Sequence, residues 1–389
     1  MKHLSTKAIH GAEDPMDNQY GDIVTPIHMS VTFAKERITE TEHGYIYSRT
    51  ANPTRDKLES KLAMLEDAEC GLAFSSGMAA ETTLLMATLS SGSTIVALDD
   101  LYGGTKRLFR IFSEKFKMKI VYVDATSTSN LKKAVKNVNP ELVWIETPSN
   151  PLLKIVDIRE SVEIAHEENA LVVVDNTFAS PVFQKPLLLG ADVVVHSATK
   201  YISGHSDVLA GSIMLNNREL CGKMKFLQNA LGAVLSAHDS WLLLRSIKTL
   251  PLRMKKHEEN AMKIAEYLSS HDLVKRVLYP GLTEHPGHEI AKRQMTGFSG
   301  MLSFELRGRL KDAVTFVEAL KVFKLAESLG GVESLVEIPS LMTHASVPRE
   351  EREKLGISDT LIRMSVGIED LEDLLDDISN AFHKLNKQK

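Results

Sequence analysis

Lys200 is the first residue whose position could support chemistry. It stands in "ADVVVHSATK", where an apolar run gives way to small polar residues. A short apolar run of this kind predicts a buried strand, and burial lowers the pKa of a lysine because it penalises the charged form. A neutral amine near pH 7 can attack a carbonyl carbon. An exposed lysine is the ordinary alternative, but Ser197 and Thr199 place hydroxyl groups beside this one.

Two further segments supply a carboxylate and an anion site. Asp175 directly follows the apolar residues "LVVV", and a buried carboxylate requires a cation nearby; a helix cap or a turn is the other interpretation. In "SSGMAAETTLL", Gly77 and Met78 open an alanine-rich helix. The free N–H groups and the dipole at a helix N-terminus favour an anion, although an ordinary N-cap explains the same pattern.

These features together fit one ligand. Pyridoxal 5'-phosphate has a phosphate, a ring nitrogen that needs a carboxylate, and a carbonyl that needs an amine. A lysine that forms a Schiff base and an aspartate that contacts the pyridinium nitrogen are the expected protein groups.

The secondary-structure elements that must position these groups can be predicted because short apolar runs alternate with helical patterns along the sequence. Apolar runs closed by polar residues predict strands within 93–100, 118–125, 141–148, 170–177 and 191–198. Helical patterns separate most of them, as at 130–138 and 158–169. This order predicts an α/β fold with a mostly parallel sheet covered on both faces. Ligands of such sheets bind at the carboxyl ends of the strands, where Asp175 and Lys200 fall.

Three regions are predicted along the chain. Residues 1–55 are irregular and turn-rich, and such a segment either wraps its own domain or reaches a neighbouring subunit. Residues 56–245 form the predicted large, cofactor-binding domain. Residues 246–389 contain a long amphipathic helical pattern, two strand-like runs and a terminal helix, which predict a smaller α+β domain. No Gly/Ser linker separates the domains, so we expect them to pack together.

Composition narrows the possible partners. The 389 residues are 43% hydrophobic and 25% charged, with a net charge of −5, which is typical of a globular protein. This balance disfavours nucleic acid and membrane as partners and favours a small molecule. Cys70 and Cys221 form no CxxC motif, so we expect them to be free thiols. Free thiols and the lack of an apolar leader at the N-terminus predict a cytoplasmic protein.

The motifs also resemble a known family. "YSRTANPTRDKLE", "SSGMAA", "DDLYGGTKR", "WIETPSNP", "VVVDNTFASP", "HSATKYISGHSDVLAG", "AESLGGVESL", "MTHASV" and "LIRMSVGIEDLEDLLDDI" are similar to the Cys/Met-metabolism enzymes that depend on pyridoxal phosphate, the trans-sulfuration enzymes. The resemblance covers nearly the whole chain. It implies a fold type I, aminotransferase-like architecture and a homotetramer built from active dimers.

The resemblance also assigns roles to residues. It implies that Lys200 forms the Schiff base, that Asp175 contacts the pyridinium nitrogen, and that Tyr102 stacks on the ring and exchanges protons. The expected phosphate contacts are Gly77, Met78, Ser197 and Thr199, with Tyr47 and Arg49 supplied by the neighbouring subunit. Arg363, Ser328 and Asn150 are expected to hold the substrate α-carboxylate, for which the fork of an arginine is suited.

The expected reaction is γ-elimination, from cystathionine to cysteine, 2-oxobutanoate and ammonia. Glu333 falls where γ-cleaving members of the family carry a glutamate that helps to select the distal end of cystathionine. Ile46, before "YSR", stands where an acidic residue is usual, which leaves γ-cleavage of methionine or γ-replacement on an activated homoserine open. Gly104 stands where methionine-cleaving members have a cysteine.

Other classes of function have weaker support. A nucleotide-binding GxGxxG after a strand and a GxxxxGK[ST] loop are both missing from the sequence. The segment "HPGHE" at 285–289 lacks the HExxH spacing of a zinc hydrolase, and no metal is expected. A catalytically inactive binding protein is disfavoured because Lys200, Asp175, Tyr102 and Arg363 are all present.

Overall fold

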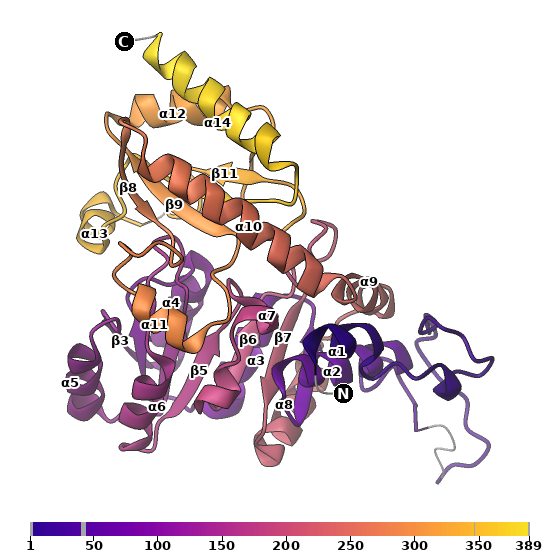
Figure 1. Ribbon diagram of the computed structural model, residues 1–389. Coiled ribbons are helices and arrows are strands. Elements are labelled where there is room, and N and C mark those ends of the chain that lie inside the picture. Colours follow the sequence, from indigo (N-terminus) through magenta and orange to yellow (C-terminus); the bar gives the residue numbers. More distant parts are fainter. Residues whose placement is uncertain (1–2, 40–43, 346, 388–389) are drawn as a thin grey trace.

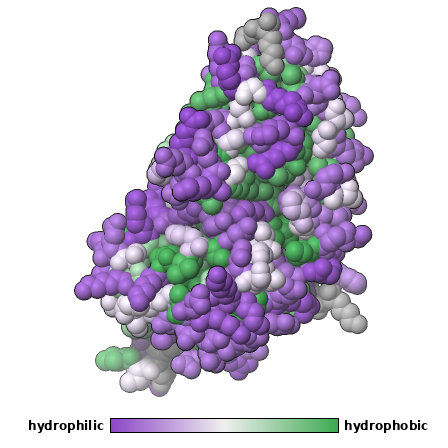
Figure 2. All heavy atoms as spheres, turned by 90° about the vertical axis from the view of Figure 1, so that its left-hand side faces the viewer, coloured by the Kyte–Doolittle hydropathy of each residue, from purple (hydrophilic) through white to green (hydrophobic). Residues whose placement is uncertain are grey.

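Two β-sheets organise the molecule (Figure 1). The computed structural model describes residues 3–39, 44–345 and 347–387. One sheet lies in the lower half of the view and the other in the upper half, and a long segment near the N-terminus extends to one side. Among the described residues, no helix combines the length and the apolar composition needed to cross a bilayer. The face that carries α5 and α13 is largely hydrophilic, with small apolar patches (Figure 2).

The larger sheet carries the strands predicted around Asp175 and Lys200. Its strand order is β1-β7-β6-β5-β4-β2-β3, and only β7 runs against its neighbours. The sheet is therefore mostly parallel, as predicted. The five parallel strands from β2 to β6 match the predicted apolar runs, whereas β1 and β7 were not predicted. The bounds are β1 Cys70–Phe74, β2 Thr94–Leu98, β3 Lys119–Val123, β4 Leu142–Glu146, β5 Leu171–Asp175, β6 Val193–His196 and β7 Gly211–Leu215.

Helices cover both faces of this sheet, and several of them begin at a residue whose side chain caps the helix. Asn52 accepts hydrogen bonds from the N–H groups of Thr54 and Arg55, and Pro53 occupies the first turn of α2. Ser127 caps α5 in the same way through the N–H of Asn130. The bounds are α1 Leu4–His10, η1 Pro15–Asp17, α2 Pro53–Glu66, α3 Gly77–Thr88, α4 Gly103–Phe116, α5 Thr128–Val138, α6 Ile158–His166, α7 Ser180–Phe183, η2 Pro186–Leu189, α8 Arg218–Leu231 and α9 Ala237–Ile247.

The smaller sheet has the order β10-β11-β12-β9-β8 and is mainly antiparallel. Phe304 of the sheet contacts Phe316 of α12, which in turn contacts Phe382 of α14, so aromatic rings join the layers of this core. The proposed boundary between the two domains near residue 245 stays a proposal. The strands of the larger sheet come before residue 245 in the sequence, and those of the smaller sheet come after it. The bounds are α10 Leu250–Ser269, β8 Val274–Leu278, α11 His288–Gln294, β9 Met301–Leu306, α12 Leu310–Ala319, β10 Lys324–Leu325, β11 Leu335–Glu337, α13 Arg349–Leu355, β12 Leu361–Ser365 and α14 Leu371–Asn386.

The segment between α1 and α2, here called the arm (11–39 and 44–52), exposes an unusual amount of apolar surface. It leaves the body of the molecule (Figure 1) and returns where the N–H of His28 donates to Thr54 Oγ1. Large apolar side chains on it that are more than half exposed are Met16, Tyr20, Ile23, Met29, Val31 and Ile38. A run of exposed apolar residues of this kind marks a surface that contacts another molecule.

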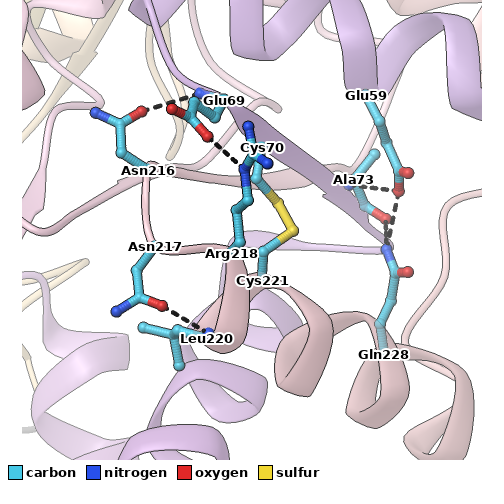
Figure 3. Close-up of a disulfide and its surroundings, with 10 residues drawn as sticks. All are labelled: Glu59, Glu69, Cys70, Ala73, Asn216, Asn217, Arg218, Leu220, Cys221 and Gln228. Atoms are coloured by element: carbon cyan, nitrogen blue, oxygen red, sulfur yellow. Dashed lines mark hydrogen bonds and ion pairs between the residues drawn. A yellow bond between two sulfur atoms is a disulfide. The ribbon is translucent and has the colours of Figure 1, made fainter.

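The two cysteines correct one expectation from the sequence. Cys70 at the start of β1 and Cys221 in α8 form a disulfide, with their Cα atoms 6.3 Å apart (Figure 3). They are separated by 151 residues, and only the stacking of α8 on the edge strand brings them together. Beside the bridge, Gln228 of α8 donates to Glu59 and to the carbonyl oxygen of Ala73. The prediction of free thiols was wrong.

We expect removal of the bridge to destabilise the protein. The double variant Cys70→Ser with Cys221→Ser should lower the free energy of unfolding by about 2–4 kcal/mol, because the bridge restricts a long loop in the unfolded chain. Denaturant unfolding of the variant and of the oxidised wild type measures the difference. Reduced wild-type protein is the control and should match the double variant. Equal stability of the oxidised and reduced wild-type forms would contradict the prediction.

Candidate functional site

A cavity of about 350 Å³ lies at the carboxyl ends of β4 and β5 and is bordered by residues of β12 and of the segment between β10 and β11. Glu146 and Asp175 reach it from those strand ends, Lys200 from the turn after β6, and Arg363 from β12. This edge is where a parallel sheet is expected to bind a ligand. Chemistry-bearing residues from both sheets therefore meet in one cavity.

Lys200 lies in a short turn that the sheet holds at both ends. The Oγ1 of Thr199 donates to the carbonyl oxygen of Ala210 and accepts from the N–H of Ala210. The Nζ of Lys200 donates to the Oγ of Ser328, 2.8 Å away. Burial, with a further contribution from the charge of Arg363, lowers the pKa of Lys200 from 10.5 to about 8. The amine is thus closer to its neutral, nucleophilic form than an ordinary lysine.

Asp175 lies at the end of β5 and is only 7% exposed. Its Oδ1 accepts hydrogen bonds from the N–H and the hydroxyl of Thr177, and the same hydroxyl oxygen accepts from the N–H of Ser197. Burial raises the pKa of Asp175, and the bonds from Thr177 oppose that shift. A cation placed in the cavity would favour the ionised form. The site is therefore suited to a positively charged ring nitrogen.

The start of α3 forms the anion-binding end of the cavity. Ser76 caps the helix by accepting from the N–H of Ala79, and Gly77 and Met78 line the cavity in the first turn. A Cβ on Gly77 would lie 3.2 Å from the Cβ of Ser197, so glycine lets the two segments approach. Ser197 and Thr199 line the same cavity. Hydroxyl groups and a helix N-terminus together suit a phosphate.

Arg363 of β12 is buried and has partners in the loop after β4, in the segment between β10 and β11, and on β11. Its Nη1 donates to Asn150 Oδ1 at 2.9 Å and lies 3.0 Å from Glu337 Oε1, and its Nη2 donates to the carbonyl oxygen of Ser328. Glu337 is the direct cross-strand neighbour of Arg363 in the β11–β12 pair. The fixed guanidinium presents charge to the cavity, as binding of a carboxylate requires.

Tyr102 stands at the mouth of the cavity, immediately before α4. Its side chain is 40% exposed, and its backbone N–H donates to Glu146 Oε2 at 2.9 Å. Burial raises the pKa of Tyr102, so the phenol holds its proton at neutral pH. A Cβ at Gly104 would lie 2.3 Å from Cε1 of Tyr102. Any side chain at position 104 would therefore displace this ring.

The structure does not bring all of the predicted residues to this cavity. Tyr47 and Arg49 lie on the arm, where Arg49 stacks over the Tyr47 ring at 5.6 Å, and neither lines the cavity of its own chain. Glu333 is exposed and accepts a hydrogen bond from Ser206 at 3.3 Å. The glutamate that lines the cavity from this segment is Glu327.

Several residues of the site were missed in the sequence. Glu146 ends an apolar strand just as Asp175 does, so the argument used for Asp175 would have found it. Glu81 and Glu327 also line the cavity, and nothing in their local sequence marks them. Glu337 touches Arg363 only through the pairing of two strands.

The residues present fit pyridoxal phosphate. The donor groups at Gly77, Met78 and Ser197 suit its phosphate, Asp175 suits its ring nitrogen, and Lys200 suits its aldehyde. Thr199 lines the same cavity, but its hydroxyl and its N–H both donate to the carbonyl oxygen of Ala210. The unpartnered Nε of buried Arg363 leaves hydrogen-bonding capacity for the carboxylate of an amino acid.

Comparisons with known proteins extend over the whole described chain. A sequence model of the family described as Cys/Met metabolism PLP-dependent enzyme matches residues 5–383. The chain is 51% identical over 381 residues to cystathionine gamma-lyase of Dictyostelium discoideum, with 98% of each chain covered. It is 50% identical over 386 residues to cystathionine beta-lyase of Lactococcus lactis subsp. cremoris, with 99% of this chain and 100% of that one covered. A crystal structure of cystathionine gamma synthase from Xanthomonas oryzae pv. oryzae, in complex with aminoacrylate and cysteine, matches with a TM-score of 0.97 at 44% identity and covers 100% of both chains.

We expect the lowered pKa of Lys200 to be measurable in protein freed of cofactor. Competitive acetylation followed over pH by mass spectrometry should give a midpoint near pH 8 for Lys200. The variant Arg363→Gln should raise this midpoint, because the guanidinium charge helps to lower the pKa of Lys200. Exposed Lys133, in the same sample, serves as the reference for the reagent. A midpoint at the ordinary lysine value of 10.5 would contradict the prediction.

Proposed function

The chain belongs to the Cys/Met metabolism PLP-dependent enzyme family, and we propose that within this family it cleaves the γ carbon–sulfur bond of L-cystathionine. The products are cysteine, 2-oxobutanoate and ammonia, and the class is a pyridoxal-phosphate-dependent carbon–sulfur lyase. The observation that carries the proposal is the cavity in which Lys200, with its lowered pKa, faces Asp175 and a buried arginine. Relatives named cystathionine gamma-lyase support it.

The residues of the cavity divide the work of binding. Bound pyridoxal phosphate supplies an aldehyde that joins to amines and a protonated ring that accepts the electron pair left at the substrate Cα. Asp175 holds the ring proton, and Gly77, Met78, Ser197 and Thr199 hold the phosphate. Arg363, supported by Asn150 and Ser328, holds the α-carboxylate of the substrate. These contacts orient the Cα–H bond toward Lys200.

Lys200 moves the protons of the reaction. Its neutral Nζ takes the proton from the substrate Cα, and the resulting ammonium can return that proton elsewhere on the bound substrate. When no substrate is in the cavity, the hydrogen bond from Nζ to Ser328 Oγ holds the amine in place. Lys200, neutral again after that return, then takes a proton from Cβ. The electron pair left at Cβ expels the sulfur from Cγ, and Tyr102, which holds its proton at neutral pH, protonates the departing thiolate. Positioned acids and bases of this kind accelerate a step by about 100- to 10,000-fold.

The choice of substrate depends on the mouth of the cavity. We propose Glu327, and not Glu333, as the carboxylate that meets the distal ammonium of cystathionine, because only Glu327 lines the cavity. Methionine cleavage is the second candidate, because Ile46 removes an expected acidic residue. Gly104, which stands where methionine-cleaving members of the family have a cysteine, disfavours it. γ-Replacement on an activated homoserine also stays open, as does β-cleavage, the activity for which two relatives are named.

We further propose a homotetramer built from active dimers. The exposed apolar side chains of the arm need a covering surface, and a second copy of this chain is the occupant that also explains Tyr47 and Arg49. Both residues are exposed and lie outside the cavity of their own chain. In the dimer they would complete the phosphate site of the neighbouring subunit.

A cytoplasmic location is kept as a separate proposal. The expectation of free thiols supported a cytoplasmic location. The Cys70–Cys221 disulfide argues against that location, because disulfides are rare in reducing compartments.

We expect the holoenzyme to convert L-cystathionine to cysteine and 2-oxobutanoate. Chromatographic identification of the sulfur product and of the keto acid tests this directly. Homocysteine with pyruvate would instead mean β-cleavage. Release of methanethiol from methionine, with cystathionine left intact, would favour the second candidate and refute the first.

Two glutamates provide a matched pair within that assay. Glu327→Gln should raise the KM for cystathionine about tenfold, the loss expected for one charge-assisted contact, and should leave kcat nearly unchanged. Glu333→Gln, an identical change six residues away on the exposed surface, is the control and should behave as the wild type. An effect of Glu333→Gln alone would restore the assignment made from the sequence.

We expect mixed subunits to reveal the shared site. Arg49→Ala should weaken cofactor retention, and Lys200→Ala should abolish turnover. When the two variants are unfolded and refolded together, about a quarter of the sites should regain both residues if Arg49 acts across a twofold interface. Activity no higher than that of the separate variants would contradict the proposal of a shared site.

A further inference from the structure

Glu81 is a buried carboxyl in the cavity to which the reaction above gives no role. It lies one turn into α3, is 3% exposed and lines the cavity. Its Oε1 accepts a hydrogen bond from the hydroxyl of Thr105 at 3.1 Å. Its Oε2 is buried and has no hydrogen-bond partner. An ionised carboxylate in this position would keep one oxygen unsolvated, which is costly.

Other acidic groups surround Glu81 and make its ionisation still less favourable. The charge of Asp175, at the end of β5, raises the pKa of Glu81. The charge of Glu81 in turn raises the pKa of Glu146, at the end of β4, and that of Tyr102, at the start of α4. Lys200 lines the same cavity from the turn after β6. Burial and the charge of Asp175 raise the pKa of Glu81 to about 8. Four carboxyl groups, those of Glu81, Glu146, Asp175 and Glu327, thus line one cavity that is expected to receive a single ring cation.

We propose that Glu81 is a positioning residue that stays protonated and donates a hydrogen bond from Oε2 into the cofactor cavity. Thr105 fixes this arrangement, because its hydroxyl donates to Oε1 and so leaves the proton on Oε2. Asp175 then carries the negative charge opposite the ring nitrogen without competition from a second carboxylate. The inference rests on the family's cofactor and not on the proposed substrate.

Cofactor affinity and the absorbance of the bound cofactor test the proposal without any substrate. At pH 7, Glu81→Leu should weaken cofactor binding about fivefold, the loss of one net hydrogen bond. Glu81→Gln, whose amide can donate as the protonated acid does, should rescue affinity to within about twofold of the wild type. If Glu81 were instead an anion that binds the ring cation, Glu81→Gln would weaken binding as much as Glu81→Leu, and the proposal would be overturned.

Variants of Thr105 test the same idea from outside the cavity lining. The absorbance of the cofactor bound to the wild type should change at alkaline pH, and this transition should be missing in Glu81→Gln. Its loss in that variant would assign the transition to Glu81 and not to Lys200 or Tyr102. Because the bond from Thr105 lowers the pKa of Glu81, Thr105→Val should move that transition to higher pH, and Thr105→Ser should restore it. A transition that persists in Glu81→Gln, or one that Thr105→Val leaves in place, would refute the role. Failure of cystathionine cleavage would leave all of these outcomes unaffected.

Discussion

The need to satisfy buried cations organises this site. Arg363 is buried and Lys200 is partly buried, and each donates to a residue from the other half of the fold. Arg363, from the smaller sheet, donates to Asn150 in the loop after β4, and Lys200, from the larger sheet, donates to Ser328. A buried charge without such partners would cost several kcal/mol. The two sheets are therefore held in one relative position by the same groups that are proposed to bind and to deprotonate the substrate.

Charges of both signs line the cavity. Glu146 and Asp175 lie at the ends of β4 and β5, whereas Lys200 and Arg363 both donate to Ser328, and Glu337 pairs with Arg363. Pyridoxal phosphate and an amino acid together have the complementary arrangement, with a cationic ring nitrogen at one end and a carboxylate at the other. Burial raises the pKa of Asp175 and lowers that of Lys200, so ligand binding restores charges that the cavity alone disfavours. This is why the cofactor and the protein are chemically matched.

The sequence predicted the parts of the site whose signals are local. Apolar runs marked the five parallel strands, and the polar residues at two strand ends marked Asp175 and Lys200. It could not predict contacts that depend on strand register, such as Glu337 against Arg363, or the pairing of two cysteines 151 residues apart. Glu327 and Glu333 lie in one irregular segment, where no periodicity indicates which side chain faces inward. The resemblance to a family chose the exposed one.

The antiparallel strand β7 has a consequence for how this chain can change. Parallel neighbours require a helical crossover, but β7 lets the chain return beside β6 after a short connection that carries Lys200. Thr199 and Ala210 bond to each other across that connection. Insertions or deletions between β6 and β7 would therefore shift the reactive amine relative to both sheets. The connection around α13 carries no such constraint, so differences in length among homologous chains should accumulate there.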